Sequence, residues 1–116
     1  MNVISLTGNL CRDVQVRYTK NNKSYVENTI GVLKDKKNED GTSQGDFIDF
    51  VAFEKKGDYL GNYAKKGDKI EITGKLRVDT WENEQGERKQ RTYVVADTVK
   101  ILTSRPKQQK NEETPF

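Results

Sequence analysis

Three aromatic residues, Phe47, Phe53 and Trp81, stand at positions where strand alternation predicts exposure to solvent. Exposed rings beside cations suggest binding of unpaired nucleic-acid bases, because a base stacked on a ring is worth roughly 1–3 kcal/mol while Lys and Arg contact the phosphates. Every base has a π-face, so such binding would be largely independent of nucleotide sequence. The nearby cations that fit this chemistry are Lys55, Lys75 and Arg77.

The same rings also have structural interpretations. A register slip or a bulge would turn Phe47 and Phe53 into the core, and a subunit interface could cover them, so both alternatives stay open for these two residues. For Trp81 the binding role is favoured, because the only tryptophan lies in a cleanly alternating strand before a long polar hairpin. Asp49 shares the predicted solvent face and argues against a uniformly positive surface, unless it pairs with a Lys or Arg.

The composition limits which activities are plausible. The 116 residues carry a formal charge of +3, no histidine and a single cysteine, which excludes a histidine general base, a Cys-His nucleophile and the common zinc sites. Carboxylates are scattered among lysines, so no catalytic residue, metal or cofactor is predicted. Two alternatives remain: a nuclease that uses carboxylates and a divalent ion, and an adaptor whose exposed rings bind another protein.

The remaining bulk features concern size and location. Only 32% of the residues are hydrophobic, which leaves room for one small core and suggests that another subunit completes the apolar surface. We found no apolar N-terminal stretch typical of a signal peptide or a membrane span, which predicts a cytoplasmic protein.

The first half of the chain alternates as strands do. The first strand runs over residues 3–7, stops at Gly8 and Asn9, and continues bent over residues 14–18, followed by a polar turn at residues 20–23. A second strand covers residues 24–33 and ends in a hydrophilic loop over residues 34–45.

A third strand and a helix follow. In residues 46–53 alternation places Ile48, Phe50 and Ala52 on one face, and Val51 with the charged Asp49 on the other. Asp58 can cap a short helix, and Gly67 suits the position just past its end.

Two strands complete the pattern. Residues 69–81 point Ile70, Ile72, Leu76 and Val78 inward, and Gly74 permits a close approach or a bend. A hairpin centred on Gln85 and Gly86 leads into a last strand over residues 91–102.

This order of three strands, a helix and two strands predicts an all-β domain with one short helix, over residues 1–103. The economical candidate is an OB-fold, a five-stranded Greek-key barrel with its helix between strands 3 and 4. Residues 104–116 are predicted to be a short flexible tail.

Taken together, these motifs resemble the bacterial and phage single-stranded DNA-binding protein family over nearly the whole chain. The resemblance is carried by residues 1–10, Asp13, and residues 16–19, 46–48, 51–53, 63–68, 72–76, 81–83 and 112–116. It implies an OB-fold that assembles as a homotetramer, with a dimer as the alternative, and wraps single-stranded DNA during replication, recombination and repair.

The resemblance also implies site residues. The stacking positions of the family fall on the same three rings that alternation places in solvent, Phe47, Phe53 and Trp81, and its basic positions fall on Lys55, Lys66 and Arg77. Lys75 is added from strand alternation alone. A further aromatic of many relatives would align near Lys36, where this chain has no ring, which predicts a smaller or weaker footprint there.

The tail departs from the family pattern. Relatives usually carry a long linker, several acids and a terminal Pro-Phe, whereas here only Glu112 and Glu113 precede Pro115 and Phe116. The resemblance implies that these four residues bind replication or recombination proteins, while Lys107 and Lys110 weaken the electrostatic part; a merely frayed end is the alternative. The short tail suggests a phage member of the family from a Gram-positive host.

Overall fold

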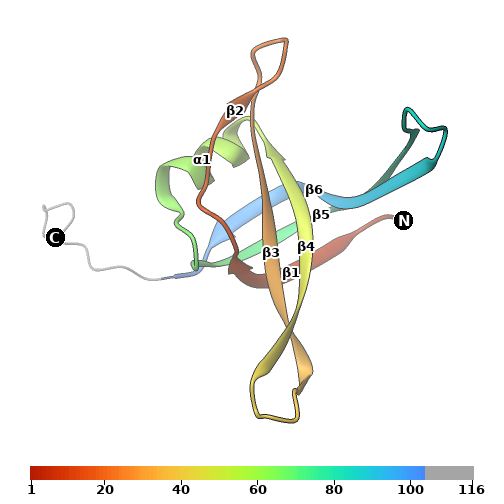
Figure 1. The fold of residues 1–116 in the computed structure, drawn as a ribbon. Coiled ribbons are helices and arrows are strands. Elements are labelled where there is room, and N and C mark those ends of the chain that lie inside the picture. The colour runs from red at the N-terminus through yellow and green to blue at the C-terminus, as the bar shows by residue number, and fades with distance from the viewer. Residues whose placement is uncertain (104–116) are drawn as a thin grey trace, which may run out of the picture.

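The computed structural model describes residues 1–103, including their side chains except at residues 35–37 and 43. The predicted tail, with Glu112, Glu113, Pro115 and Phe116, lies outside the described residues. The elements are β1 (Ile4–Leu10), β2 (Arg17–Tyr18), β3 (Ser24–Lys37), β4 (Ser43–Phe53), α1 (Lys55–Tyr63), β5 (Lys69–Glu82) and β6 (Arg88–Ile101) (Figure 1).

Five long strands close into a barrel. β1 pairs antiparallel with both β5 and β3, β4 pairs antiparallel with β3, and β5 with β6. The circle is completed by a short parallel pairing of β4 with β6, at Phe50 with Val94 and Val51 with Val95. This arrangement confirms the predicted OB-fold barrel, with α1 between the third and fourth long strands and the short β2 paired to β3.

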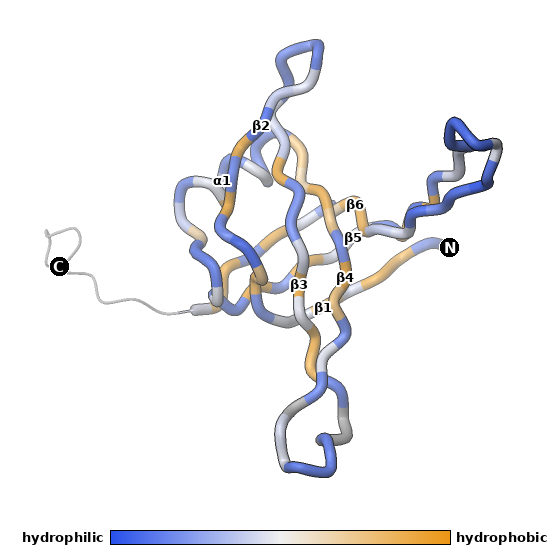
Figure 2. The backbone as a smooth tube through the Cα atoms, viewed as in Figure 1, coloured by the Kyte–Doolittle hydropathy of each residue, from blue (hydrophilic) through white to orange (hydrophobic). Residues whose placement is uncertain are grey.

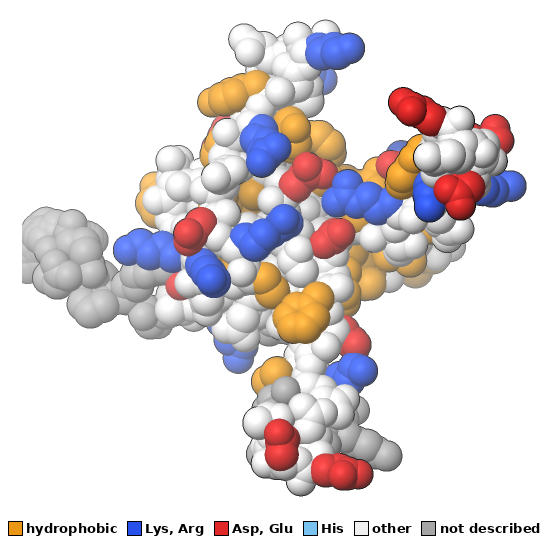
Figure 3. Space-filling view, in the orientation of Figure 1, with side chains coloured by type: hydrophobic (Ala, Val, Ile, Leu, Met, Phe, Trp, Pro, Cys, Tyr) orange, Lys and Arg blue, Asp and Glu red, His pale blue; other side chains and the backbone are white. Residues whose placement is uncertain are grey.

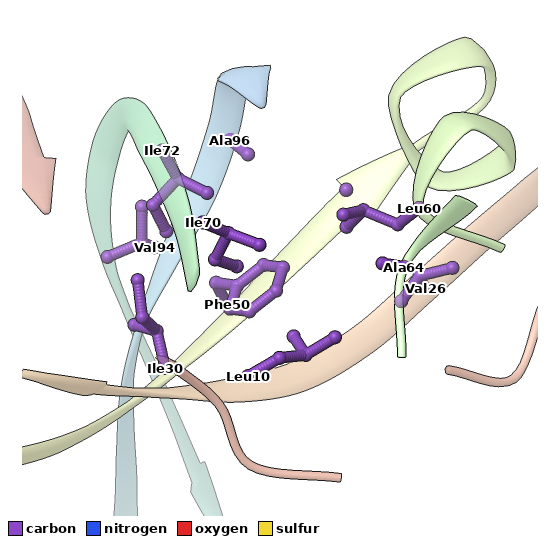
Figure 4. Packing of buried hydrophobic residues seen from close by; sticks show 11 residues of the cluster. Leu10, Val26, Ile30, Phe50, Leu60, Ala64, Ile70, Ile72, Val94 and Ala96 are labelled. Carbon is purple, nitrogen blue, oxygen red and sulfur yellow. The ribbon is translucent and has the colours of Figure 1, made fainter. Parts of the chain in front are cut away.

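The core lies where the alternating apolar residues converge inside the barrel. Phe50 is fully buried near the centre of the cluster (Figure 4), with Leu60 of α1 and Ala64, the residue after α1, on one side and Ile70 of β5 on the other. Helix α1 therefore covers one end of the barrel, as expected for a helix too short to be stable alone.

β1 runs through Gly8 and Asn9 without a break, so the predicted stop at these residues is wrong. Gly8 is needed because a Cβ atom there would lie 2.2 Å from the backbone oxygen of Gly31, at the point where β1 pairs with β3. The glycine permits barrel closure rather than a turn. Of the predicted continuation over residues 14–18, only Arg17 and Tyr18 form a strand.

The predicted loop over residues 34–45 is mostly strand. β3 continues to Lys37 and β4 begins at Ser43, so the connection spans only residues 38–42. The β3–β4 and β5–β6 hairpins both extend well beyond the barrel (Figure 1). The tip of the β5–β6 hairpin is strongly hydrophilic (Figure 2), and Gly86 adopts a positive φ of 80° in its turn.

Helix α1 begins earlier than predicted. Asp58 lies in its first turn rather than at its N-cap, which is Glu54 with a φ of 55°. The helix ends at Tyr63, and Gly67 belongs to the following turn, where its N–H donates to the backbone oxygen of Leu10. No helix in residues 1–103 is long and apolar enough to cross a membrane.

The inward face of β5 is buried only in its first half. Ile70 and Ile72 are fully buried as predicted, whereas Leu76 and Val78 are exposed, so the prediction that they point into the core is wrong. A register shift lies between Thr73 and Gly74, just before the segment in which β6 closes onto β4 at Val94 and Val95. Beyond Leu76 the β5–β6 ribbon has no other strand of residues 1–103 beside it, which explains the exposure of Val78.

Candidate nucleic-acid interface

Four neighbouring strands place one set of side chains on the outside of the barrel. Cross-strand partners share a face of a sheet, and the register pairs Tyr25 with Phe53, Val51 with Val95 and Arg77 with Tyr93. We call this surface the outer face. Its members are Tyr25, Glu27, Thr29, Phe47, Asp49, Val51, Phe53, Lys75, Arg77, Asp79, Trp81, Lys89, Arg91, Tyr93 and Val95.

All three predicted rings lie on the outer face and are accessible. Phe47 is 72% exposed, Phe53 37% and Trp81 47%, so within this chain no slip or bulge turns them inward. The Phe47 ring lies against Gly31, because a Cβ atom added to Gly31 would be 3.4 Å from the ring. Phe53 packs beside Tyr25 with the ring centroids 6.2 Å apart. The prediction of exposed rings is confirmed.

Three of the four predicted cations are near these rings in the fold. Lys75 and Arg77 project from the outer face of β5, and Lys55 follows Phe53 at the start of α1; all three are exposed. Lys66 differs, because it lies in the turn between α1 and β5, next to a Gly67 that is hydrogen-bonded to the end of β1. Lys75 and Arg77 therefore share the outer face with the rings, Lys55 adjoins it two residues after Phe53, and Lys66 lies in a separate turn.

Val51 is a partial exception to the predicted solvent face. Its side chain belongs to the outer face, but it is buried, with only 6% exposed. It lines a hollow of about 200 Å³, which we call the tyrosine hollow, together with the rings of Tyr25, Phe53 and Tyr93 and the charged side chains of Glu27, Asp79 and Arg91. The three rings offer stacking surfaces for a flat ring such as a base.

Arg91 and Tyr93 of β6 are outer-face residues that the sequence did not single out. The Arg91 guanidinium carbon lies 5.1 Å from the centre of the Tyr93 ring, within the range of a cation–π contact. Its Nη1 donates to Glu27 Oε2 at 3.2 Å, and its Nη2 lies 3.7 Å from Asp49 Oδ2. The predicted ion pair of Asp49 is thus confirmed, and Arg91 is its partner.

Hydrogen bonds hold two other outer-face groups. Thr29 Oγ1 donates to Asp49 Oδ1 at 2.9 Å, and Tyr93 Oη donates to Asp79 Oδ2 at 2.9 Å. The bond to Asp79 raises the pKa of Tyr93 above its usual value of 10.0. The Tyr93 hydroxyl therefore stays protonated, and remains a donor, throughout the neutral pH range.

A second hollow adjoins the tyrosine hollow and is polar. It has a volume of about 490 Å³ and is lined by three arginines and three carboxylates, which we call the arginine hollow: Arg12, Arg17, Arg91, Asp13, Glu27 and Asp49. Glu27 and Arg91 line both hollows, so their ion pair forms the partition between them.

A buried amide fixes one side of the arginine hollow. Asn28 is 1% exposed; its Oδ1 accepts from Arg12 N at 3.2 Å, and its Nδ2 donates to Arg12 O at 3.0 Å. These two bonds satisfy a buried polar group and position the backbone of Arg12 beside the barrel.

The outer face combines stacking surfaces with mixed charge. Figure 3 shows Lys and Arg interspersed with Asp and Glu over the barrel strands, with no large area of one sign. The exposed rings can hold bases, and Lys75 and Arg77 can hold phosphates, whereas Arg91 already contacts the carboxylates of Glu27 and Asp49. Within residues 1–103 no group of three or more His, Cys, Asp or Glu residues is arranged to hold a metal ion.

The sequence is similar to proteins of known name. It is 40% identical over 105 residues to Single-stranded DNA-binding protein 1 of Streptococcus pyogenes, covering 90% of this chain and 81% of that protein. It is 39% identical over 105 residues to the Single-stranded DNA-binding protein of Streptococcus mutans, covering 90% of this chain but only 64% of that longer protein.

The fold has a solved counterpart in a Plasmodium falciparum SSB complex with ssDNA, with a TM-score of 0.75 at 18% identity over 89% of this chain and 96% of that one. The family model described as Single-strand binding protein family matches residues 1–102, and this chain belongs to that family.

Proposed function

We infer that this chain binds single-stranded DNA largely without sequence preference, and that it coats and protects transient single strands rather than catalysing a reaction. The observation that carries this inference is the set of exposed rings Phe47, Phe53 and Trp81 on one outer face, in a chain of the single-strand binding protein family. Both the S. pyogenes and the S. mutans relatives are named for this binding.

The proposed mechanism is base stacking with phosphate contacts from cations. Bases stack on the three rings, and Lys55, Lys66, Lys75 and Arg77 neutralise phosphates. Each neutralised phosphate releases condensed counterions, so affinity should fall with salt at a slope near −0.7 per contact. A coated strand cannot pair with itself, which removes DNA secondary structure.

The fluorescence of Trp81 tests this function directly, because it is the only tryptophan. Addition of poly(dT) should quench the emission as bases stack on the half-exposed indole. Binding should be much weaker to a duplex of equal length. A clear preference for the duplex would refute the function, and tight binding without any change in emission would remove Trp81 from the site.

We propose further that the chain forms homo-oligomers, a tetramer being the expected state and a dimer the alternative. Support comes from Val3, Leu76 and Val78, which are large apolar residues exposed on the single chain. The Asn2 amide donates to Leu76 O at 2.8 Å and accepts from Leu76 N at 2.9 Å, so the first residues extend along β5 beside this apolar area. Light scattering of the free protein tests the state, and a monomeric mass at all concentrations would refute it.

The tail and the biological setting are also proposals. We propose that Glu112, Glu113, Pro115 and Phe116 bind replication or recombination proteins, in the cytoplasm of a bacterial host and as part of a phage-type member of the family. The support is the family resemblance of Glu112 and Glu113 followed by Pro115 and Phe116. Truncation after Thr103 should leave the affinity for poly(dT) unchanged and abolish binding of the protein partner.

A further inference from the structure

Arg91 occupies a position on the outer face that fits DNA contact better than a purely structural role. It lies at the junction of the arginine hollow, whose charged residues are three arginines and three carboxylates, and the tyrosine hollow, which has three aromatic rings. A nucleotide has the same division, since its phosphate is charged and its base is flat and apolar on both faces. A base in the tyrosine hollow would therefore bring a neighbouring phosphate close to the Arg91 guanidinium.

The ion pairs of Arg91 are easily exchanged. The side chains of Arg91, Glu27 and Asp49 are 42%, 39% and 44% exposed, and a pair this accessible to water changes an equilibrium by a factor of about five at most. A DNA phosphate offers the guanidinium two acceptor oxygens in a planar, bidentate geometry. The stacked Tyr93 ring, 5.1 Å away, would keep the side chain at the face during the exchange.

The charges of the arginine hollow also favour a local exchange over long-range attraction. Arg12, Arg17 and Arg91 are balanced by Asp13, Glu27 and Asp49, so the hollow has no formal excess of positive charge. Arg91 is the arginine of this hollow that forms ion pairs with carboxylates, so a phosphate reaches its guanidinium only by exchange with them. Glu27 is the carboxylate that Arg91 touches most closely.

We propose that Arg91 is a DNA-contacting residue that exchanges Glu27 and Asp49 for a DNA phosphate, so that these two carboxylates limit the affinity for single strands. This inference rests on the single-strand binding proposed above. It adds Arg91 of β6 to the proposed interface. It also assigns a role to Glu27 and Asp49, which limit the affinity for DNA by holding Arg91.

A double-mutant cycle with a fluorescent (dT) oligonucleotide tests the exchange. Arg91→Ala should weaken binding about tenfold, because it removes a charge-assisted contact with a phosphate. Glu27→Gln should strengthen wild-type binding about two- to fivefold, because binding no longer breaks the ion pair. In the Arg91→Ala background the gain from Glu27→Gln should be clearly smaller, because no pair remains to be broken.

The dependence on salt provides an independent measurement. Lys55→Ala should reduce the salt slope by about 0.7, as loss of one ordinary phosphate contact does. Arg91→Ala should reduce the salt slope by less than half as much. When Arg91 of the wild type binds a phosphate, the released carboxylates of Glu27 and Asp49 take up cations from solution, and this uptake offsets part of the cations that the phosphate releases. The matched controls are Lys100→Ala and Glu71→Gln, which remove the same charges from two exposed register partners outside both hollows. The effect of each control on the affinity for the oligonucleotide should be the same whether or not the other is present.

The outcomes separate this inference from the function on which it rests. A wild-type protein that fails to bind the oligonucleotide refutes the proposed function, and the exchange with it. If the wild type binds but Arg91→Ala binds equally well, or Glu27→Gln gives the same gain in both backgrounds, only the exchange is refuted. Arg91→Lys, which keeps the charge but loses the bidentate geometry, should bind with intermediate affinity and replaces Arg91→Ala if that variant does not fold.

Discussion

Replacement of Phe47, Phe53 and Trp81 together by alanine should weaken binding of a (dT) oligonucleotide by at least about a hundredfold. Each ring is worth roughly 1–3 kcal/mol as a stacking surface. Phe47 and Phe53 are separated by roughly 20 Å along β4 at about 3.4 Å per residue, far enough for their contributions to add. Fluorescence anisotropy of a labelled oligonucleotide gives the affinities of the triple and single variants.

The triple variant should still fold, because the three rings are exposed and the core does not depend on them. Tyr63→Ala is the matched control, since Tyr63 is also an exposed ring but lies on α1 beside Tyr59 and is not a member of the outer face. Circular dichroism melting curves should be similar for both variants and the wild type. Loss of the folded state in the triple variant would show that the rings are structural.

Gly74→Ala should destabilise the fold by about 3–5 kcal/mol, since forced overpacking against backbone has no flexible neighbour to relieve it. A Cβ atom at Gly74 would lie 2.0 Å from the backbone oxygen of Val95 and 3.0 Å from the Cα of Ala96. Both contacts are with main-chain atoms of β6, so the two strands would have to separate. Urea denaturation followed by circular dichroism gives the change in unfolding free energy.

Gly45→Ala is the control for this substitution. Gly45 also lies in a strand, but its nearest contact with an added Cβ is 3.4 Å, to the backbone oxygen of Val32. We expect a change of no more than about 0.5 kcal/mol, typical of a surface substitution. Equal midpoints for Gly74→Ala and Gly45→Ala would mean that β5 and β6 tolerate the extra methyl group.

Strand alternation predicted the barrel because the core positions repeat every second residue. Phe50, Ala52, Ile70 and Ile72 were assigned inward by this rule, and all are buried. Gly74 was assigned to a close approach or a bend, and the structure has both, with a tight contact to β6 and a register shift beside it. Local pattern was sufficient here because each of these strands has one dry face.

Alternation could not say where the barrel ends. Leu76 and Val78 do share a face with Ile70 and Ile72, but Leu76 lies at the end of the barrel and Val78 beyond it, and both are exposed. Val51 shows the opposite difference between facing and burial. It points outward, yet it is buried because its outer-face neighbours cover it. Burial of these residues depends on neighbours from distant strands, which periodicity alone does not contain.

The start of α1 was missed because tertiary packing overrides local propensity. Gly57 is a poor helix residue, yet it lies within the helix, where an added Cβ would be 2.6 Å from the backbone oxygen of Ala52. Only glycine lets the helix approach the barrel this closely. The Glu54 N–H donates to Ser24 O at 2.7 Å, which fixes the chain direction just before the helix.

The rings of the candidate site were predictable, and Arg91 was not. Phe47, Phe53 and Trp81 are rare large residues at outward positions of strands with clear alternation. Arg91 lies at the polar end of β6, and the register shift changes which of its residues point outward: Ala96 is inward on one side of the shift and Val99 on the other. The facing of Arg91 follows only once the pairing of β6 with β5 is known.

The double pairing of β1 has a consequence for how the molecule forms during synthesis. β1 is synthesised first, and in the folded protein its Ile4 pairs with Gly74 of β5. The pairing of β1 with β5 can therefore be completed only after 70 more residues have been synthesised. At about 5–20 residues per second, this delay is roughly 4–14 seconds of synthesis. During that time the nascent chain cannot close its barrel, and the edge of β1 that β5 will later cover is open to chaperones or to misfolding.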